Sequence, residues 1–231
     1  MKELNIKKLQ CVVMAGGLGT RLGKITKNVP KPLVNINGKP FIYFLLKSLI
    51  SKGLKNFLII VSYKKDLIIN YINKDFKKEI KFKFFHDKDR RGTYNAIIKS
   101  KMNLKKEFLY CNADEIIDVN LKKFYNEFKM KKFHTLCTII KSKKGYLNCN
   151  RSKKIIKEYS LDQGNYIETG LKLINRKIIE RNGKYIKLEE FLYKKLIKKN
   201  KLGYYKILKM PLRIDTLKDL KIKRKKLYFK V

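Results

Sequence analysis

Residues 9–40 read LQCVVMAGGLGTRLGKITKNVPKPLVNINGKP, and this stretch decides the fold class. It begins with a short apolar run, residues 9–15, that leads directly into glycines, which is typical of a buried strand followed by a tight turn. A glycine-rich loop at the carboxyl end of a strand can bring backbone N–H groups close to a phosphate. Two common phosphate loops do not fit. A Walker A loop would need glycine at Leu18 and Ser or Thr at Ile25, and the dinucleotide loop G-x-G-x-x-G would need glycine at Leu22.

Outward from this stretch, apolar runs and helical patterns alternate along the first half of the chain. Strands are predicted at 56–62, 80–85 and 107–112, and helices at 40–51, 65–76 and 93–102. This alternation predicts an α/β fold with a doubly wound, mostly parallel sheet of the Rossmann-like kind. The second half is less regular, with helices expected at 121–130, 188–199 and 216–226, and strands at 135–141, 166–174 and 204–210. Residues 145–159 are expected to form strands joined by a polar turn at 151–154.

The chain of 231 residues carries 58 Lys and Arg against 19 Asp and Glu, a formal net charge of +39. Fifty of the basic residues are Lys, and they are dispersed along the sequence, so the charge favours solvated lysine faces over a nucleic-acid-binding surface. No apolar run approaches the roughly 20 residues of a membrane span, and the N-terminal apolar run is too short for a signal peptide. We therefore expect a cytoplasmic protein with no transmembrane segment and no specific nucleic-acid partner.

The stretch from residue 13 to residue 40 resembles the signature of the sugar-1-phosphate nucleotidylyltransferases, or nucleotide-sugar pyrophosphorylases. That signature is a small-residue strand followed by G-G-x-G-T-R-L, a Thr, P-K-P and G-K-P. The matching residues here are Gly16-Gly17-Leu18-Gly19-Thr20-Arg21-Leu22, Thr26, Pro30-Lys31-Pro32 and Gly38-Lys39-Pro40. Within the family, the chain looks most similar to the short heptose- or mannose-1-phosphate guanylyltransferases. The resemblance implies one nucleotidyltransferase domain over residues 1–231, with a nucleotide-binding half at about 9–118 and a smaller sugar-phosphate-binding half at about 119–231.

The resemblance also implies a reaction. An NTP and a sugar 1-phosphate would give an NDP-sugar and pyrophosphate, with Mg²⁺ as the cofactor. The most similar subfamily suggests GTP with a heptose or mannose 1-phosphate, for the synthesis of cell-surface polysaccharide, and the resemblance leaves a homodimer open. Such a transfer needs positioning and charge neutralisation more than a covalent nucleophile, because both substrates and the leaving pyrophosphate are anionic.

The family's functional positions map onto residues of this chain. Nucleotide-binding roles fall on Ala15, Gly16, Gly17, Leu18, Gly19, Thr20, Asp87, Gly92 and Thr93. Sugar-contacting roles fall on Asn112, Glu168, Thr169 and Gly170, and Mg²⁺-binding roles on Asp114 and Asp215. The catalytic cations would be Arg21, whose planar fork suits the β- and γ-phosphates, and Lys31, whose place between two prolines suits the α-phosphate. Carboxylates together with phosphate oxygens are the ligands that Mg²⁺ prefers.

Three departures from the family pattern leave alternatives open. Aligning Thr216 with the family's Thr places Arg213 at the second metal position and displaces Asp215 by two residues, or roughly 7 Å along a strand. Either the local register differs and Asp215 is the ligand, or the second ligand is absent, with Glu115 and Asp118 as other acids that could compensate. The family's sugar-phosphate lysine has no clear counterpart, and Lys157 and Lys172 are the candidates. Ala113 replaces a glycine, and Tyr94-Asn95 replace small residues. The alternatives are a catalytically impaired nucleotide- or sugar-phosphate-binding homologue and, from the charge, a polyanion-binding basic protein.

Overall fold

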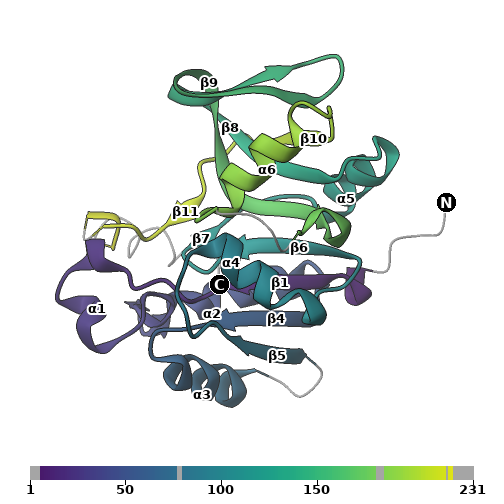
Figure 1. The fold of residues 1–231 in the computed structure, drawn as a ribbon. Coiled ribbons are helices and arrows are strands. Elements are labelled where there is room, and N and C mark those ends of the chain that lie inside the picture. The colour runs from purple at the N-terminus through teal and green to yellow at the C-terminus, as the bar shows by residue number, and fades with distance from the viewer. Residues whose placement is uncertain (1–5, 77–79, 181–184, 217, 221–231) are drawn as a thin grey trace.

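The computed structural model describes residues 6–76, 80–180, 185–216 and 218–220. Within these residues the chain folds around a seven-stranded sheet of order β10-β8-β9-β6-β1-β4-β5 (Figure 1). Its strands are β1 (Gln10–Met14), β4 (Asn56–Val61), β5 (Lys81–His86), β6 (Glu107–Asn112), β8 (Thr135–Asn150), β9 (Ile155–Asn175) and β10 (Leu202–Lys206). Strand β9 runs antiparallel to β6, β8 and β10, whereas the remaining pairs are parallel. The prediction of an α/β fold with a mostly parallel sheet is confirmed.

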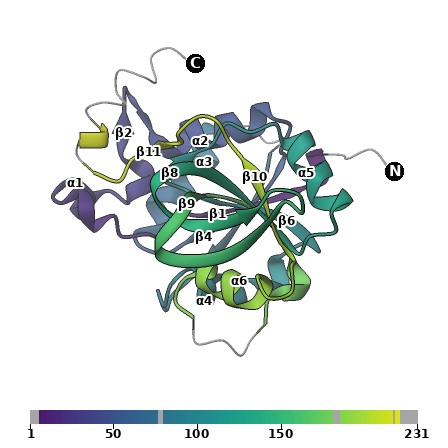
Figure 2. The same ribbon diagram turned by 90° about the horizontal axis from the view of Figure 1, so that it is seen from above.

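Helices cover both faces of the sheet, as Figure 2 shows from above. One face packs against α2 (Phe41–Ser51), α3 (Lys65–Asp75) and α5 (Leu121–Met130), and the other against α4 (Thr93–Lys99) and α6 (Leu188–Leu196). The alternation of side chains along β1 explains this arrangement, because Cys11 and Val13 enter the first core cluster while Val12 enters the second. Apolar residues on both faces fit a strand that helices cover on both sides, and β1 lies between β4 and β6.

Short elements complete the described structure. Two small two-stranded sheets form, one from β2 (Asn35–Ile36) and β3 (Lys39–Pro40), the other from β7 (Glu115–Ile116) and β11 (Leu212–Arg213). The short helices are η1 (Ile6–Lys8), η2 (Thr20–Leu22), α1 (Ile25–Asn28), η3 (Lys31–Leu33), η4 (Lys101–Asn103) and η5 (Arg176–Ile178). The β7–β11 pair joins the late part of the chain to the segment that follows β6, which brings residues about 100 positions apart into one site.

The second half differs from the sequence expectation in several bounds. The polar turn expected at 151–154 is confirmed, since it lies between β8 and β9. The strands expected at 135–141, on either side of the turn within 145–159, and at 166–174 are parts of these two longer strands, which form one hairpin with several register shifts. Strand β10 begins earlier than expected and ends at Lys206, and α6 ends at Leu196 rather than at residue 199. Of the helix expected at 216–226, only 218–220 are both described and helical, and the remainder lies outside the described residues.

Candidate active site

A cavity of about 560 Å³ opens at the carboxyl ends of the central parallel strands. In open α/β sheets this edge is where ligands bind. Its wall combines residues that follow β1, β4, β5 and β6 with two residues at the start of α6. Of the predicted site residues, those that line it are Gly16, Gly17, Leu18, Arg21, Lys31, Asp87, Gly92, Thr93, Asn112 and Asp114.

The glycine-rich loop after β1 is shaped by close packing. Gly19 has a φ of +69°, and a Cβ there would lie 2.9 Å from Cβ of Lys31. Gly16 passes so near β4 that its Cβ would lie 3.0 Å from Cβ of Ser62. The Thr26 hydroxyl donates a hydrogen bond to the Gly19 carbonyl at 3.0 Å, which ties the loop to the following turn. Glycine is therefore needed at Gly19 because of its left-handed backbone and the close approach of Lys31.

Lys31 lies at the centre of the charged part of the site. Its Nζ donates to Asp114 Oδ2 at 2.5 Å and to Asp215 Oδ1 at 2.8 Å. Arg21 Nη2 lies 3.4 Å from the same oxygen of Asp215. The Lys31 side chain is only 9% exposed, whereas the two carboxylates are 31% and 22% exposed. Partial burial would raise the pKa of Asp215, but the hydrogen bond and the charge of Lys31 outweigh it and hold that pKa below its ordinary value.

Asp114 and Asp215 converge on one cation although they are far apart in sequence. Asp114 follows β6, and the Ile214 N–H donates to the Asp114 carbonyl at 3.2 Å, which anchors the two chain segments side by side. Among the described residues no three His, Cys, Asp or Glu side chains gather as a metal-binding group. Two carboxylates nevertheless fit Mg²⁺, which takes its remaining ligands from phosphates and water. The convergence on Lys31 shows that a cation can be held between them.

Arg213 does not occupy the place of a metal carboxylate. It pairs with Glu115 in the β7–β11 register, and its Nη2 lies 2.9 Å from Glu115 Oε1. The other oxygen of Glu115 accepts from the Gly170 N–H at 2.8 Å. Burial raises the pKa of Glu115, and the charge of Arg213 opposes that rise. Arg213, the residue that suggested an impaired homologue, thus forms an ion pair with Glu115. Asp215 instead turns toward Lys31.

Removing Arg213 should therefore affect stability. The Glu115 side chain is 2% exposed and Arg213 is 36% exposed, so Arg213→Met leaves a buried carboxylate without its cation. We expect a loss of about 2 kcal/mol in the free energy of unfolding, less than for a fully buried pair because water reaches Arg213. Urea denaturation measures the loss, and Glu115→Gln in the same chain should recover most of it. A loss of turnover with unchanged stability would show instead that Arg213 acts on substrate.

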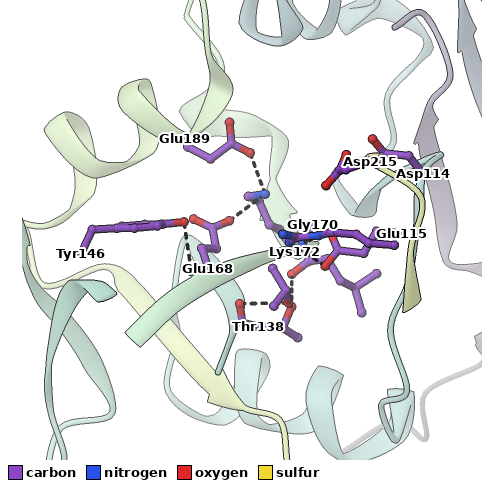
Figure 3. A network of polar contacts seen from close by, with 12 residues as sticks. Asp114, Glu115, Thr138, Tyr146, Glu168, Gly170, Lys172, Glu189 and Asp215 are labelled. Atoms are coloured by element: carbon purple, nitrogen blue, oxygen red, sulfur yellow. Dashed lines mark hydrogen bonds and ion pairs between the residues drawn. The ribbon is translucent and has the colours of Figure 1, made fainter. Parts of the chain in front are cut away.

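The predicted sugar-contacting residues Glu168, Thr169 and Gly170 lie within β9, outside the cavity lining. The Thr169 hydroxyl shares a hydrogen bond with the Thr138 hydroxyl at 2.5 Å. The Glu168 carboxylate is buried against Lys172, whose Nζ lies 2.6 Å from Oε1 (Figure 3). Each of these three groups is thus occupied within the protein, so their contact with a sugar stays a prediction.

Two lysines were candidates for the sugar-phosphate contact. Lys172 is 1% exposed and lies between the carboxylates of Glu168 and Glu189. Lys157 is exposed on β9 and does not line the cavity. Lys187, just before α6, does line it. The sequence analysis missed Lys187, although it immediately precedes the Leu188–Glu189 start of the helix.

The loop at Gly92 and Thr93 explains how Lys187 and Glu189 reach the cavity. The Thr93 hydroxyl accepts a hydrogen bond from the Leu188 N–H at 2.9 Å. A Cβ on Gly92, whose φ is +96°, would lie 2.3 Å from the Ile186 carbonyl oxygen. The start of α6 is therefore fastened to the predicted nucleotide-binding loop, and the two lie against the same cavity.

The remaining predicted residues occupy different environments. Asp87 is 6% exposed, and its Oδ1 has no hydrogen-bond partner among the described residues although it lines the cavity. Ala15, Gly19 and Thr20 belong to the glycine-rich loop but do not line the cavity. Asp215 does not line it either. Lining residues to which the sequence analysis gave no site role are Met14, Pro32, Ile60, Ser62, Arg90, Tyr110, Ala113, Lys187 and Glu189.

Fold and site together define an α/β protein whose cavity is lined by a glycine-rich loop, the cations Arg21 and Lys31 and the carboxylate of Asp114, with Asp215 paired to Lys31. The chain belongs to the nucleotidyl transferase family, which matches residues 10–149. Along the described residues, no helix combines the length and the apolar character that a membrane crossing requires.

Named relatives agree with this assignment. A D-glycero-alpha-D-manno-heptose 1-phosphate guanylyltransferase of Campylobacter jejuni is 38% identical over 123 residues, 53% of this chain and 55% of the relative. Mannose-1-phosphate guanylyltransferase 1 of Arabidopsis thaliana is 26% identical over 187 residues, 75% of this chain and 52% of the relative. The matches thus span about half the length of these relatives. The crystal structure of HddC from Yersinia pseudotuberculosis superposes with a TM-score of 0.77 and 25% identity, covering 95% of this chain and 99% of that one.

Proposed function

We propose that this protein joins an NTP to a sugar 1-phosphate, giving an NDP-sugar and pyrophosphate. The observation that carries the proposal is the position of Lys31, which lines the cavity together with Asp114 and the glycine-rich loop and also forms an ion pair with Asp215. These groups match what the transfer demands, because cations and backbone amides can neutralise and orient the anionic substrates.

The chemistry follows from the anionic character of the substrates. An oxygen of the sugar phosphate forms a bond to the α-phosphorus of the NTP, while the bond from that phosphorus to the oxygen bridging to the β-phosphate breaks. Pyrophosphate leaves with the bonding electron pair, so the protein has no proton to transfer. Backbone N–H groups of Gly16 and Gly17 would hold the triphosphate, and Lys31 would stabilise charge at the α-phosphate. Arg21, whose side chain is 72% exposed at the cavity, would bind the departing phosphates.

Mg²⁺ belongs to the proposal as a cofactor. Asp114 and Asp215 would hold it, because their carboxylates already share one cation and remain partly open to water. When bound, the ion would supply positive charge to the phosphate oxygens. Lys187 extends the positive wall toward the start of α6, where it would bind the phosphate of the sugar.

The proposed base and sugar rest on the similarity to named relatives and on one residue, Asp87. We propose that the substrates are GTP and a heptose or mannose 1-phosphate. The reaction would take place in the cytoplasm, and its product would serve the synthesis of cell-surface polysaccharide. Two of the relatives above are named for these guanylyl transfers, and HddC was also crystallised with GMP-PN. The buried Asp87 adds a physical reason, since an acceptor-only carboxylate suits the adjacent N–H donors of guanine.

A substrate panel tests the pairing. Each of the four ribonucleoside triphosphates is combined with heptose, mannose, glucose and N-acetylglucosamine 1-phosphates in the presence of Mg²⁺, and pyrophosphate release is measured. We expect GTP with heptose or mannose 1-phosphate to give the highest kcat/KM. Efficient turnover with another base would contradict the guanine assignment.

A further inference from the structure

A buried lysine, Lys172, lies between the carboxylates of Glu168 and Glu189 (Figure 3). The Lys172 side chain is 1% exposed, and its Nζ lies 2.6 Å from Glu168 Oε1 and 2.8 Å from Glu189 Oε1. Its ammonium also lies 4.9 Å from the ring centre of Tyr110. Burial alone would lower the pKa of Lys172, but the two carboxylates outweigh it and keep the lysine charged. Replacing such a buried ion-pair network by hydrophobic residues of similar volume often leaves protein stability unchanged or higher, so stability is a weak reason for the network to be present.

One end of this network is fixed inside the protein. The Glu168 side chain is 2% exposed, accepts a hydrogen bond from the Tyr193 hydroxyl, and lies 2.6 Å from Lys172. The Glu168 backbone N–H donates to the Tyr146 hydroxyl at 3.1 Å. Glu168 and its tyrosines therefore hold the ammonium of Lys172 in one place, and the ammonium in turn fixes the carboxylate on its other side.

The other end reaches the cavity. Glu189 lines it together with Asn112, Tyr110 and Lys187, and its side chain is 27% exposed. A carboxylate is unexpected in the lining of a cavity that binds phosphates, because its negative charge repels anions. It can, however, accept hydrogen bonds from neutral donors, and the hydroxyls of a sugar ring are such donors.

We propose that Glu189 binds hydroxyl groups of the sugar substrate, and that Lys172 is the positioning residue that aims it. This inference rests on the proposed function and names the class of sugar that the site takes. The site selects a sugar 1-phosphate with free ring hydroxyls beside Glu189 and rejects deoxy analogues, because a missing hydroxyl leaves the carboxylate without its donor. Lys187, two residues earlier, binds the phosphate end of the same molecule.

Glu189→Gln tests the contact, and Glu190→Gln is the matched control. Glu190 follows on the same helix and does not line the cavity. For Glu189→Gln we expect kcat/KM for mannose 1-phosphate to fall about 10- to 100-fold, mainly through KM, with the KM for the NTP within about 2-fold of wild type. The loss should shrink with deoxymannose 1-phosphates, since the missing hydroxyl no longer distinguishes the two proteins. An unchanged KM for every sugar overturns the inference.

The role of Lys172 is tested without leaving a buried charge. Lys172→Met alone would strand Glu168, so it is combined with Glu168→Gln, and thermal melting confirms the fold. We expect the same selective rise in the sugar KM as for Glu189→Gln. Lys172→Arg combined with Glu168→Gln should not restore it, since the longer planar fork displaces Glu189. A wild-type sugar KM in the variant that combines Lys172→Met with Glu168→Gln assigns Lys172 a structural role only and overturns its positioning role.

Direct binding separates this inference from the proposed function. Calorimetry with mannose 1-phosphate alone measures the sugar site without turnover. Binding by wild type that weakens at least about 10-fold in Glu189→Gln supports the inference even when no NTP is consumed. Turnover by wild type with equal sugar binding in both proteins overturns the inference and leaves the proposed function standing. Absence of both binding and turnover in wild type overturns both.

Discussion

Lys31→Met is expected to lower kcat about 10³-fold with the best substrate pair. The Lys31 ammonium is the cation on which Asp114 and Asp215 converge, at 2.5 and 2.8 Å, and its side chain is 91% removed from water. A fixed positive charge next to the transferring phosphate acts most strongly in a site from which water is excluded, and losing one such group typically costs 10²- to 10³-fold or more. Methionine keeps the length of the side chain and removes only the charge.

The same substitution should disturb the fold little. Both carboxylates are partly exposed and Pro30 and Pro32 keep the loop in place, so we expect the free energy of unfolding to change by no more than about 1 kcal/mol. Lys24→Met is the matched control, since Lys24 is an exposed lysine of the same segment that does not line the cavity. Steady-state kinetics and thermal melting on the three proteins decide the matter. Near-wild-type kcat in Lys31→Met would refute the role given to Lys31.

Asp114→Asn is expected to abolish measurable turnover, with a loss of at least about 10³-fold in kcat. The residue lines the cavity, and the amide keeps the shape and can still accept from Lys31 while losing the charge that a Mg²⁺ ligand needs. Because the side chain is 31% exposed, the melting temperature should stay nearly unchanged. Raising Mg²⁺ into the tens of millimolar should recover part of the activity, as a weakened metal site would.

Asp118→Asn provides the comparison for Asp114. Asp118 is 65% exposed and forms a surface ion pair with Lys52 at 3.5 Å, so its loss should change neither turnover nor Mg²⁺ dependence. If Asp114→Asn retains more than about a tenth of wild-type kcat with unchanged Mg²⁺ dependence, the metal role of Asp114 is wrong.

The first half of the fold was predictable because its signal is local. Continuous apolar runs such as those of β1 and β4 belong to buried parallel strands, and their alternating contacts with both core clusters agree with that interpretation. In the long hairpin the turn at 151–154 and the strands beside it were predicted, but the continuous strands through 142–144 and 160–165 were not. These parts of β8 and β9 are polar and irregular in register, so their strand character comes from pairing with each other rather than from a hydrophobic pattern.

The site residues also differ in how far the sequence predicts them. Arg21, Lys31 and Asp114 were found because they belong to a contiguous motif or end an apolar strand, and all three line the cavity. The pairing of Arg213 with Glu115 between β11 and β7, and that of Lys172 with Glu189 on α6, join segments far apart in sequence and are encoded by no local spacing. Lys172 in particular looks like any other lysine in a chain with 50 of them, and only its burial between two carboxylates distinguishes it.

Phosphorus NMR of the complete reaction tests the central claim most directly. Protein, GTP, mannose 1-phosphate and Mg²⁺ are mixed, and the signals of the substrates and products are followed with time. We predict that the sugar monophosphate signal is replaced by two coupled diphosphate signals of the nucleotide sugar, with one pyrophosphate released per molecule formed, and that Lys31→Met shows neither product. Release of inorganic phosphate without a new diphosphate, or no change with any triphosphate and sugar 1-phosphate while triphosphate still binds, would contradict nucleotidyl transfer at this site.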